Sequence, residues 1–389
     1  MKKILCLLHK HQFGNLEYPV SVEYKLIYKT LKKINKNTFF FDTHKEKSIH
    51  LSNLKILECV KRIKPELIFC HQSFYEIYSE TFYAIRSICS PLIINWCSDD
   101  SWRYEQHSSL IAQSFDYQIT TYKSAHNNNI KNKINSILSH WGCDENFFIK
   151  PKKKSSYMYD VSFIGNSYLG RKKIIEELKD FGINVKCFGK GWGEIIDDKQ
   201  LPLVMNNSKI NINFSKSRGN QLQTKARIFE IIGAGGFCIS EKSNEIKDFF
   251  RENHEIVIFN NLAELRNKIK YYLKNEIKRK SICNKGYWRC SKNYSYKKII
   301  QNILELTSKK KPKKPNINSS YKDLNFLTSS PSLILRLYKS ISIIIFKTFF
   351  SKEKAVKFSR RLLFEIEWRI RGEKTYSSKG WCSNLFNYS

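Results

Sequence analysis

The chain has 389 residues, of which 41% are hydrophobic and 14% aromatic, enough to form the cores of two ordinary domains and an appendage. Lysine and arginine number 68 against 35 aspartate and glutamate, so the net charge of +33 favours an anionic partner such as nucleic acid, a membrane surface or a phosphorylated substrate. No RNA-binding or helix-turn-helix signature accompanies this charge, and no apolar run reaches the ~20 residues that span a bilayer.

The cysteines favour a reducing compartment. Eleven are scattered without paired spacing, and Cys6, Cys70, Cys97 and Cys238 lie within apolar, strand-like runs. This pattern is typical of buried free thiols in the cytoplasm. No CxxC pair is present, so we expect no zinc site. The opening MKKILCLLHKHQF has too short an apolar run for a signal peptide and predicts the first strand instead.

Short apolar runs alternate with helical patterns in the first half of the chain, for example over residues 20–34 and 51–63. This alternation predicts a parallel sheet covered on both faces, in which ligands lie beyond the carboxyl ends of the strands. The predicted strands are residues 4–8, 38–41, 67–70, 92–96, 117–120 and 136–138.

Polar residues directly after these strands are the candidate catalytic residues. His71 follows ELIFC, and a neutral imidazole near pH 7 suits proton transfer, although a lone histidine is more often a satisfied surface residue. Asp99 and Asp100 follow IINWCS as candidate acid or base groups. Adjacent residues of an extended strand point to opposite sides, so we expect at most one to act and the other to cap the next helix.

A second set of alternations begins after residues 147–157, FFIKPKKKSSY, which predict the connection between domains 1–150 and 151–308. The strand over 161–164 leads to Gly165 and Asn166 and then to Arg171 at a helix start, where an anion is favoured. An ordinary arginine at a helix start is the alternative. The further strands are predicted over residues 185–188, 210–214, 237–240 and 256–259.

Two glycine-rich stretches follow. In CFGKGW, Gly189 and Lys190 lie in a turn where the backbone can approach a ligand, and Trp192 either stacks or, as we favour, packs. In KARIFEIIGAGGFC, a helix presents Lys225, Arg227 and Glu230 and ends near Gly235. Cations suit phosphates and a carboxylate suits ribose hydroxyls, but a solvated helix face would also fit this pattern.

The last of these stretches carries a family resemblance. Arg227-Ile-Phe-Glu230 followed by Gly233-Ala-Gly-Gly236 resembles the donor-site helix of group 1 glycosyltransferases, in the branch similar to spore-coat maturation glycosyltransferases. The likeness extends from about residue 161 to 303. It implies the GT-B fold, in which two Rossmann-like α/β domains face one another across a cleft.

The resemblance also implies roles for the candidates. A nucleotide-diphosphate sugar would bind the second domain at Gly165, Asn166, Arg171, Gly189, Lys190, Lys225, Arg227, Glu230 and Gly235. The first domain would bind a glycan or lipid-linked acceptor, with His71 touching the transferring sugar or an acceptor hydroxyl. Arg171, Lys225 and Arg227 would neutralise the diphosphate. Since no DxD motif is present, we expect no metal, and no cofactor besides the donor.

Two further residues can be compared with the family pattern. The segment SHWGCDENFF, which contains His140, resembles a cleft-lining segment of the family, and a structural role fits His140 equally well. Leu222 occupies a position where the wider group commonly has a glutamate. This departure favours one alternative, a noncatalytic nucleotide-sugar-binding protein of the same fold. A nucleic-acid-binding protein is the other alternative, and only the charge suggests it.

The end of the chain differs in composition. Residues 309–330 predict a basic Lys/Pro linker, and residues 331–389 a helical appendage. Within SLILRLYKSISIIIFKTFFSKEK, Arg336, Lys339 and Lys347 gather on one narrow face of an otherwise apolar helix. Such a helix lies either in an anionic membrane interface or on the protein's own surface. Together with the resemblance, the sequence predicts a cytoplasmic, metal-independent hexosyltransferase in cell-surface polysaccharide or envelope glycan synthesis. It would be peripheral on the inner face of the cell membrane if this helix lies in the interface.

Overall fold

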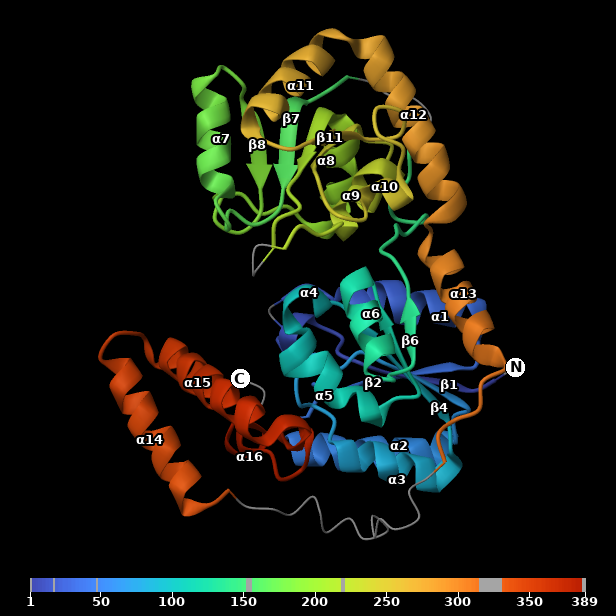
Figure 1. Ribbon diagram of the computed structural model, residues 1–389, viewed down its shortest axis with the longest axis vertical. Coiled ribbons are helices and arrows are strands. Elements are labelled where there is room, and N and C mark those ends of the chain that lie inside the picture. Colours follow the sequence, from blue (N-terminus) through green and yellow to red (C-terminus); the bar gives the residue numbers. More distant parts are fainter. Residues whose placement is uncertain are drawn as a thin grey trace. The chain divides into compact units, whose positions relative to one another are not determined.

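The computed structural model describes residues 2–16, 18–46, 48–151, 156–217, 221–314 and 331–386, which form two compact units (Figure 1). The first unit is Met1–Ser139 with Ile303–Ser389, and the second is His140–Asn302. These divisions differ from the predicted domains, because the chain changes unit after Ser139 and again within α13 (Tyr296–Ser308). Most of the predicted linker and the centre of the predicted connection, residues 315–330 and 152–155, lie outside the described residues.

The first unit contains a six-stranded parallel sheet with the strand order β2-β1-β3-β4-β5-β6. The apolar runs ILCLL and LIFC of β1 and β3 are buried along their whole length, as expected for strands covered on both faces. β1 lies between β2 and β3, so Ile4 pairs with both Thr38 and Leu67. The strands are β1 (Ile4–Leu8), β2 (Thr38–Asp42), β3 (Leu67–Cys70), β4 (Leu92–Cys97), β5 (Tyr117–Thr120) and β6 (Ser136–Leu138).

Helices connect these strands in the predicted alternation. The hydroxyl of Ser48 accepts a hydrogen bond from the Leu51 N–H at the start of α2, and Lys64 ends that helix in the left-handed conformation with φ 49°. The helices of this part are α1 (Lys29–Ile34) preceded by a π-helical turn (Tyr24–Tyr28), α2 (Ile49–Ile63), α3 (Ser79–Cys89), α4 (Asp100–Arg103), α5 (Ser109–Ile111) and α6 (Lys123–Lys131).

The second unit contains a five-stranded parallel sheet with the order β11-β10-β9-β7-β8. Its strands are β7 (Tyr159–Ile164), β8 (Val185–Phe188), β9 (Ser208–Asn213), β10 (Cys238–Glu241) and β11 (Val257–Phe259). Its helices are α7 (Arg171–Asp180), α8 (Leu201–Asn207), α9 (Ala226–Gly233), α10 (Ile246–Phe249), α11 (Leu262–Lys274) and α12 (Glu276–Asn293). The α9 residues Ile228, Phe229, Ile231 and Ile232 are buried in the core of this unit.

The C-terminal region is helical, as predicted, and it packs into the core of the first unit (Figure 1). Glu80 of α3 accepts hydrogen bonds from the Ser378 N–H and hydroxyl, and the Tyr376 hydroxyl donates to the Gln106 carbonyl over 2.6 Å. The elements are α14 (Leu333–Lys347), α15 (Lys352–Arg371), a 3-10 helix (Gly372–Tyr376) and α16 (Trp381–Leu385). Their contribution to the hydrophobic core of the first unit is Leu363, Phe364, Tyr376, Cys382, Leu385 and Phe386. None of the described helices combines the length and the apolar character needed to cross a membrane.

Candidate functional site

The loops that follow β7 and β8 pack against each other through their backbones. The Gly165 N–H donates to the Phe188 carbonyl over 2.9 Å, and the Ser167 N–H donates to the Lys190 carbonyl over 3.0 Å. Gly189 has φ 123°, and a Cβ there would lie 2.6 Å from the Gly165 carbonyl oxygen. The predicted Gly165 and Gly189 therefore belong to one surface at the carboxyl edge of the second sheet. Lys190 in the same loop is exposed.

Trp192 supports this surface from within. Its indole N–H donates to the Gly165 carbonyl over 2.8 Å, and its ring meets the ring of Phe163 edge to face at 5.9 Å between centroids. Trp192 therefore packs beneath the loop, as we favoured from the sequence.

Arg171 starts α7 and reaches across the loops. Its guanidinium donates to the carbonyls of Asn166 over 3.1 Å and of Lys216 over 3.2 Å. Burial lowers the pKa of Arg171, opposed by the nearby carboxylate of Glu241. The buried Nε has no hydrogen-bond partner among the described residues. The structure therefore fixes Arg171 at the edge where its predicted neighbours Gly165 and Asn166 lie.

Glu241, at the end of β10, shapes the loop after β9. Its carboxylate accepts from the N–H groups of Ser215 over 2.7 Å and Lys216 over 3.0 Å. It therefore orients the same Lys216 carbonyl that holds Arg171. Glu241 is not among the residues predicted from the sequence, although it is the first carboxylate after the buried run FCIS.

The start of α9 is tied to the same loop. The Gln223 N–H donates to the Ser215 carbonyl over 3.0 Å, and the Lys225 ammonium donates to the Gln223 side chain over 2.7 Å. The hydroxyls of Thr224 and Ser243 lie 2.8 Å apart, which joins this segment to the loop after β10. Lys225 therefore lies at the same edge of the sheet as Arg171.

Arg227 and Glu230 form an ion pair on α9, with 2.7 Å between Nη1 and Oε2. Their side chains are 27% and 18% exposed. Although the two charged groups are close, Arg227 Nη1 makes no hydrogen bond within the described part of the chain. Arg227 can therefore still donate a hydrogen bond to a ligand, and Glu230 can still accept one.

Gly235 lies apart from the other predicted donor residues. It follows the C-terminal end of α9 with φ 74°, and a Cβ there would lie 2.6 Å from Lys150 Cγ. It lines a cavity of about 190 Å³ with Ser208 and Phe237, which lie where β9 and β10 begin. The structure therefore does not bring Gly235 to the carboxyl edge, where Arg171 and Lys225 lie.

His71 lies directly after β3 and is buried. Its Nδ1 lies 2.7 Å from the Trp96 carbonyl, which can only accept, so Nδ1 carries the proton and donates. Nε2 of the neutral ring is then an acceptor, and the Ser73 hydroxyl lies 2.9 Å from it.

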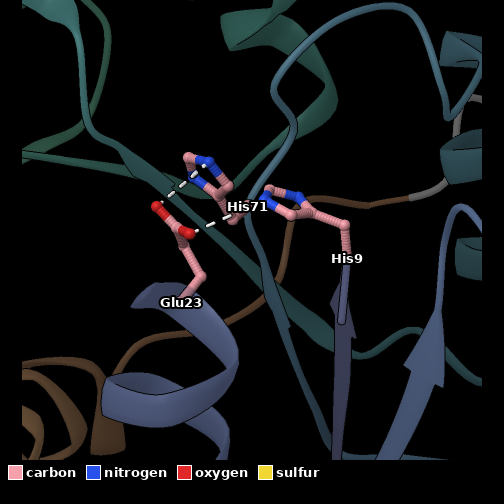
Figure 2. A group of neighbouring side chains, drawn as sticks. All are labelled: His9, Glu23 and His71. Atoms are coloured by element: carbon pink, nitrogen blue, oxygen red, sulfur yellow. Dashed lines mark ion pairs between the residues drawn. The ribbon is translucent and has the colours of Figure 1, made fainter. Parts of the chain in front are cut away.

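Two residues that the sequence analysis did not select lie beside His71 (Figure 2). His9 directly follows β1, and Glu23 precedes the π-helical turn. The Glu23 carboxylate lies 3.5 Å from His71 Nε2 and 3.6 Å from His9 Nε2. Burial lowers the pKa of His9 to about 4, against the attraction of Glu23, so His9 is neutral near pH 7. Burial opposes ionisation of Glu23, but the two histidines leave the pKa of its carboxyl below the usual value.

Asp99 and Asp100 diverge, as expected for neighbours. Asp99 is exposed at the N-cap of α4, where its side chain makes no capping bond. Asp100 is buried and accepts a hydrogen bond from the Ser108 hydroxyl, and burial raises the pKa of its carboxyl.

His140 packs within the second unit. Its ring stacks on Phe229 at 6.2 Å between centroids and meets Tyr294 edge to face at 5.1 Å. The ring nitrogen Nδ1 lies 2.8 Å from the Trp141 carbonyl. These contacts correspond to the structural alternative that the sequence left open.

Known proteins resemble this chain in sequence and in fold. Residues 171–305 match a family model described as Glycosyl transferase-like. No curated protein sequence matches the chain. The structure of Anabaena Alr3699/HepE in complex with UDP and glucose superposes with a TM-score of 0.59 at 12% identity, covering 79% of this chain and 100% of that chain.

Two other solved structures are similarly related. Sucrose-phosphate synthase from Thermosynechococcus elongatus gives a TM-score of 0.55 at 10% identity and covers 79% of this chain and 98% of that chain. A glycosyltransferase from Rickettsia africae gives 0.54 at 12% identity, covering 82% and 100%. Residues 171–305 are thus glycosyl transferase-like, and the chain has the GT-B fold that the sequence predicted.

Proposed function

We propose that this protein is a glycosyltransferase of hexosyltransferase type, in the branch similar to spore-coat maturation glycosyltransferases. It moves a sugar from a nucleotide-diphosphate sugar to a glycan or lipid-linked acceptor in cell-surface polysaccharide or envelope glycan synthesis. The observation that carries the proposal is that Arg171 and Lys225 bond to one segment at the carboxyl edge of the second sheet, and that this segment leads into α9, where Arg227 and Glu230 are paired. Ligands of open parallel sheets bind at this edge.

The donor contacts follow from the chemistry of these groups. Arg171 and Lys225 present cations held by neighbouring oxygen atoms, and the N-terminus of α9 adds backbone N–H groups, which together suit a diphosphate. Glu230 accepts from ribose hydroxyls. A related fold binds such a ligand, since Anabaena Alr3699/HepE was solved in complex with UDP-glucose, with a TM-score of 0.57.

The leaving diphosphate is neutralised by protein cations in this proposal. Arg227 is held beside Glu230, and a bound phosphate would compete for its guanidinium with the carboxylate 2.7 Å away. With Arg171 and Lys225, three cations are available at one edge, so donor binding needs no metal at the diphosphate.

The first unit supplies the acceptor groups. His71 lies at the carboxyl end of β3 with its Nε2 as an acceptor, the state that suits a hydroxyl proton. Of the two aspartates, Asp99 is the exposed one, so we assign contact with the acceptor to Asp99 and a structural role to Asp100.

Turnover distinguishes this function from the noncatalytic alternative. Radiolabelled UDP-, GDP-, ADP- and dTDP-sugars are incubated with the full chain and with cell-wall or capsule extracts, and the products are identified by mass spectrometry. We expect transfer from one donor class, or its slow hydrolysis without acceptor. Donor binding without either reaction would instead identify a binding protein.

We also propose that α14 docks on an anionic membrane surface at the inner face of the cell membrane. Its apolar residues at helical spacing are largely exposed: Leu333 72%, Ile334 78%, Leu337 52%, Ile341 55% and Ile344 64%. Lys347 is exposed beside them, and the chain carries a net charge of +33. Apolar insertion and attraction to anionic headgroups would then act together, close to a lipid-linked acceptor.

A further inference from the structure

His9, Glu23 and His71 lie together at the carboxyl edge of the first sheet (Figure 2). β1 and β3 are neighbouring strands, so the residues that directly follow them emerge side by side. Glu23 approaches both from the turn before α1. One ligand atom from each of the three residues lies within 4.8 Å of the other two.

The spacing of these atoms matches a metal coordination sphere. Glu23 oxygens lie 3.6 Å from His9 Nε2 and 3.5 Å from His71 Nε2. Zinc bonds to nitrogen and oxygen of about 2.0–2.2 Å in tetrahedral geometry place two ligands roughly 3.3–3.6 Å apart. Both distances are longer than good hydrogen bonds and close to this separation.

The charges around Glu23 favour a bound cation. Glu23 is 13% exposed, and its ion-pair partners within the described part of the chain are these two histidines, with no lysine or arginine. The Trp96 carbonyl accepts a hydrogen bond from His71 Nδ1, so Nε2, which lies 3.5 Å from the Glu23 carboxylate, is the ring nitrogen with a lone pair for an ion. Two acceptors that face each other are stabilised by a positive ion between them.

Neighbouring groups also orient the ligands as metal sites require. The hydrogen bond from His71 Nδ1 to the Trp96 carbonyl is the outer contact that a metal-binding histidine usually makes. The Ser73 hydroxyl, 2.9 Å from His71 Nε2, occupies that lone pair without metal and would rotate away on binding. The rings of His44 and His71 lie 5.5 and 5.4 Å from the His9 ring, and Asp42 adds negative charge nearby.

We propose that His9, Glu23 and His71 bind a divalent transition-metal ion, for which zinc is the best match. Two imidazoles and one carboxylate form a three-ligand set that leaves a fourth position open to water. The expectation of no zinc site was based on the absence of a CxxC pair. That motif does not detect ligands that are far apart in the sequence but close together in the fold. The site lies in the first unit, whereas every group assigned to the donor diphosphate lies in the second.

Zinc and cobalt binding test the site directly. The full chain is prepared without a histidine tag, stripped with a chelator and titrated with Zn²⁺ by calorimetry, with no nucleotide sugar present. We expect one zinc per chain, and at least about tenfold weaker binding for His9→Gln and for Glu23→Gln, the scale of loss when a metal site is impaired. His126→Gln is the matched control, because this histidine of the first unit bonds Ser136 instead. It should bind zinc like the wild type.

Cobalt substitution keeps the test decisive if a variant does not fold. Co²⁺ in the wild-type chain should give the visible bands of a four-coordinate nitrogen and oxygen site, without near-ultraviolet thiolate bands. Zinc should also raise the melting temperature of the wild type and of His126→Gln, and leave that of folded His9→Gln unchanged. Thiolate bands, no stoichiometric uptake, or equal zinc affinity in all variants would overturn the proposal. Zinc would occupy the His71 Nε2 lone pair that the proposed function assigns to an acceptor hydroxyl, so zinc uptake would replace that assignment. Because no donor is present, none of these results bears on donor binding by the second unit.

Discussion

Glu230 and Arg227 are so close that substitution of one changes the environment of the other. We predict that Glu230→Gln weakens nucleotide-sugar binding by roughly 1–3 kcal/mol, because a charged hydrogen bond to ribose becomes a neutral one. Calorimetry of the donor measures the change. Glu276→Gln, at an exposed pair with Lys280 on α12, is the control and should leave donor affinity unaltered. An affinity of Glu230→Gln equal to that of this control would show that α9 does not contact the ribose.

His140 predicts a pH dependence of stability in the second unit. Burial lowers the pKa of this imidazole below 6.5, against its bond to the Trp141 carbonyl, so the unfolded state takes up the proton first on acidification. The stabilising contribution is complete above about pH 6.5 and is lost progressively as the pH falls from there through the folded-state pKa. His140→Phe keeps an aromatic ring beside Phe229 but cannot titrate.

Urea unfolding of both proteins from pH 7.5 to 5 measures this effect. The free energy of unfolding of His140→Phe should rise relative to that of the wild type as the pH falls. A difference between the two that stays constant over this range would rule out a neutral, buried His140.

Single residues were predictable from sequence where local geometry decides. Asp99 and Asp100 were expected to diverge, and the structure has one exposed and one buried, although they lie at the N-cap and in the first turn of α4 and not in an extended strand. His9 and Glu23 could not be predicted in the same way. They lie beside His71 because β1 and β3 are neighbouring strands, and local sequence patterns do not reveal the order of strands in a sheet.

At the scale of elements, the loops after β7 and β8 depend on the absence of a side chain at Gly189. Gly189 has φ 123°, and a Cβ added there would lie 2.6 Å from the Gly165 carbonyl oxygen, so Gly189→Ala meets both strain and a backbone clash. We predict a loss of about 1–3 kcal/mol in stability, together with weaker donor binding. Chemical denaturation and calorimetry measure the two effects.

Gly193→Ala is the matched control for that loop. It also has positive φ, 85°, but nothing lies within 4 Å of a Cβ there. It should therefore lose stability through backbone strain while keeping donor affinity. Equal donor affinity in both variants would show that the contact between the two loops is not needed for binding.

The exposed face of α14 gives a second prediction for an element. Ile341→Glu with Ile344→Glu places two charges in the apolar stripe, so recovery with anionic liposomes in flotation should fall at least about tenfold. Ile277→Glu is the control, because Ile277 is 88% exposed on α12 of the second unit. If the double variant floats as well as this control, α14 does not bind membranes.

Periodicity predicted most elements well, and its limits appear in α14. The helix predicted over residues 51–63 matches α2, and the predicted strands match the observed ones, to within two residues at each end. For α14, the pattern placed Lys339 with the cations of a membrane face. In the structure the Lys339 ammonium donates to the Leu385 carbonyl over 2.6 Å, a contact between segments that periodicity cannot show.

At the scale of the whole molecule, the C-terminal helices are part of the first unit. Phe364 and Tyr376 lie in its core, and Glu367 accepts from the N–H groups of Trp381 and Cys382. A chain ending at Ser308 would expose this core, so surface substitutions test membrane binding better than truncation does. The sequence predicted an appendage because the intervening Lys/Pro tract resembles a linker, and composition does not tell where the chain packs after it.

The central claim is that the carboxyl edge of the second sheet binds a nucleotide-diphosphate sugar. Its most direct test is calorimetric titration of the full chain with UDP-, GDP-, ADP- and dTDP-sugars. The preferred donor, its nucleoside diphosphate and its free nucleoside are then titrated into the Arg171→Gln variant. We predict that one donor class binds with a stoichiometry of one, and that Arg171→Gln weakens binding of the sugar nucleotide and the nucleoside diphosphate far more than binding of the free nucleoside. Absence of binding by every donor, or an equal loss for nucleoside and diphosphate, would contradict the account.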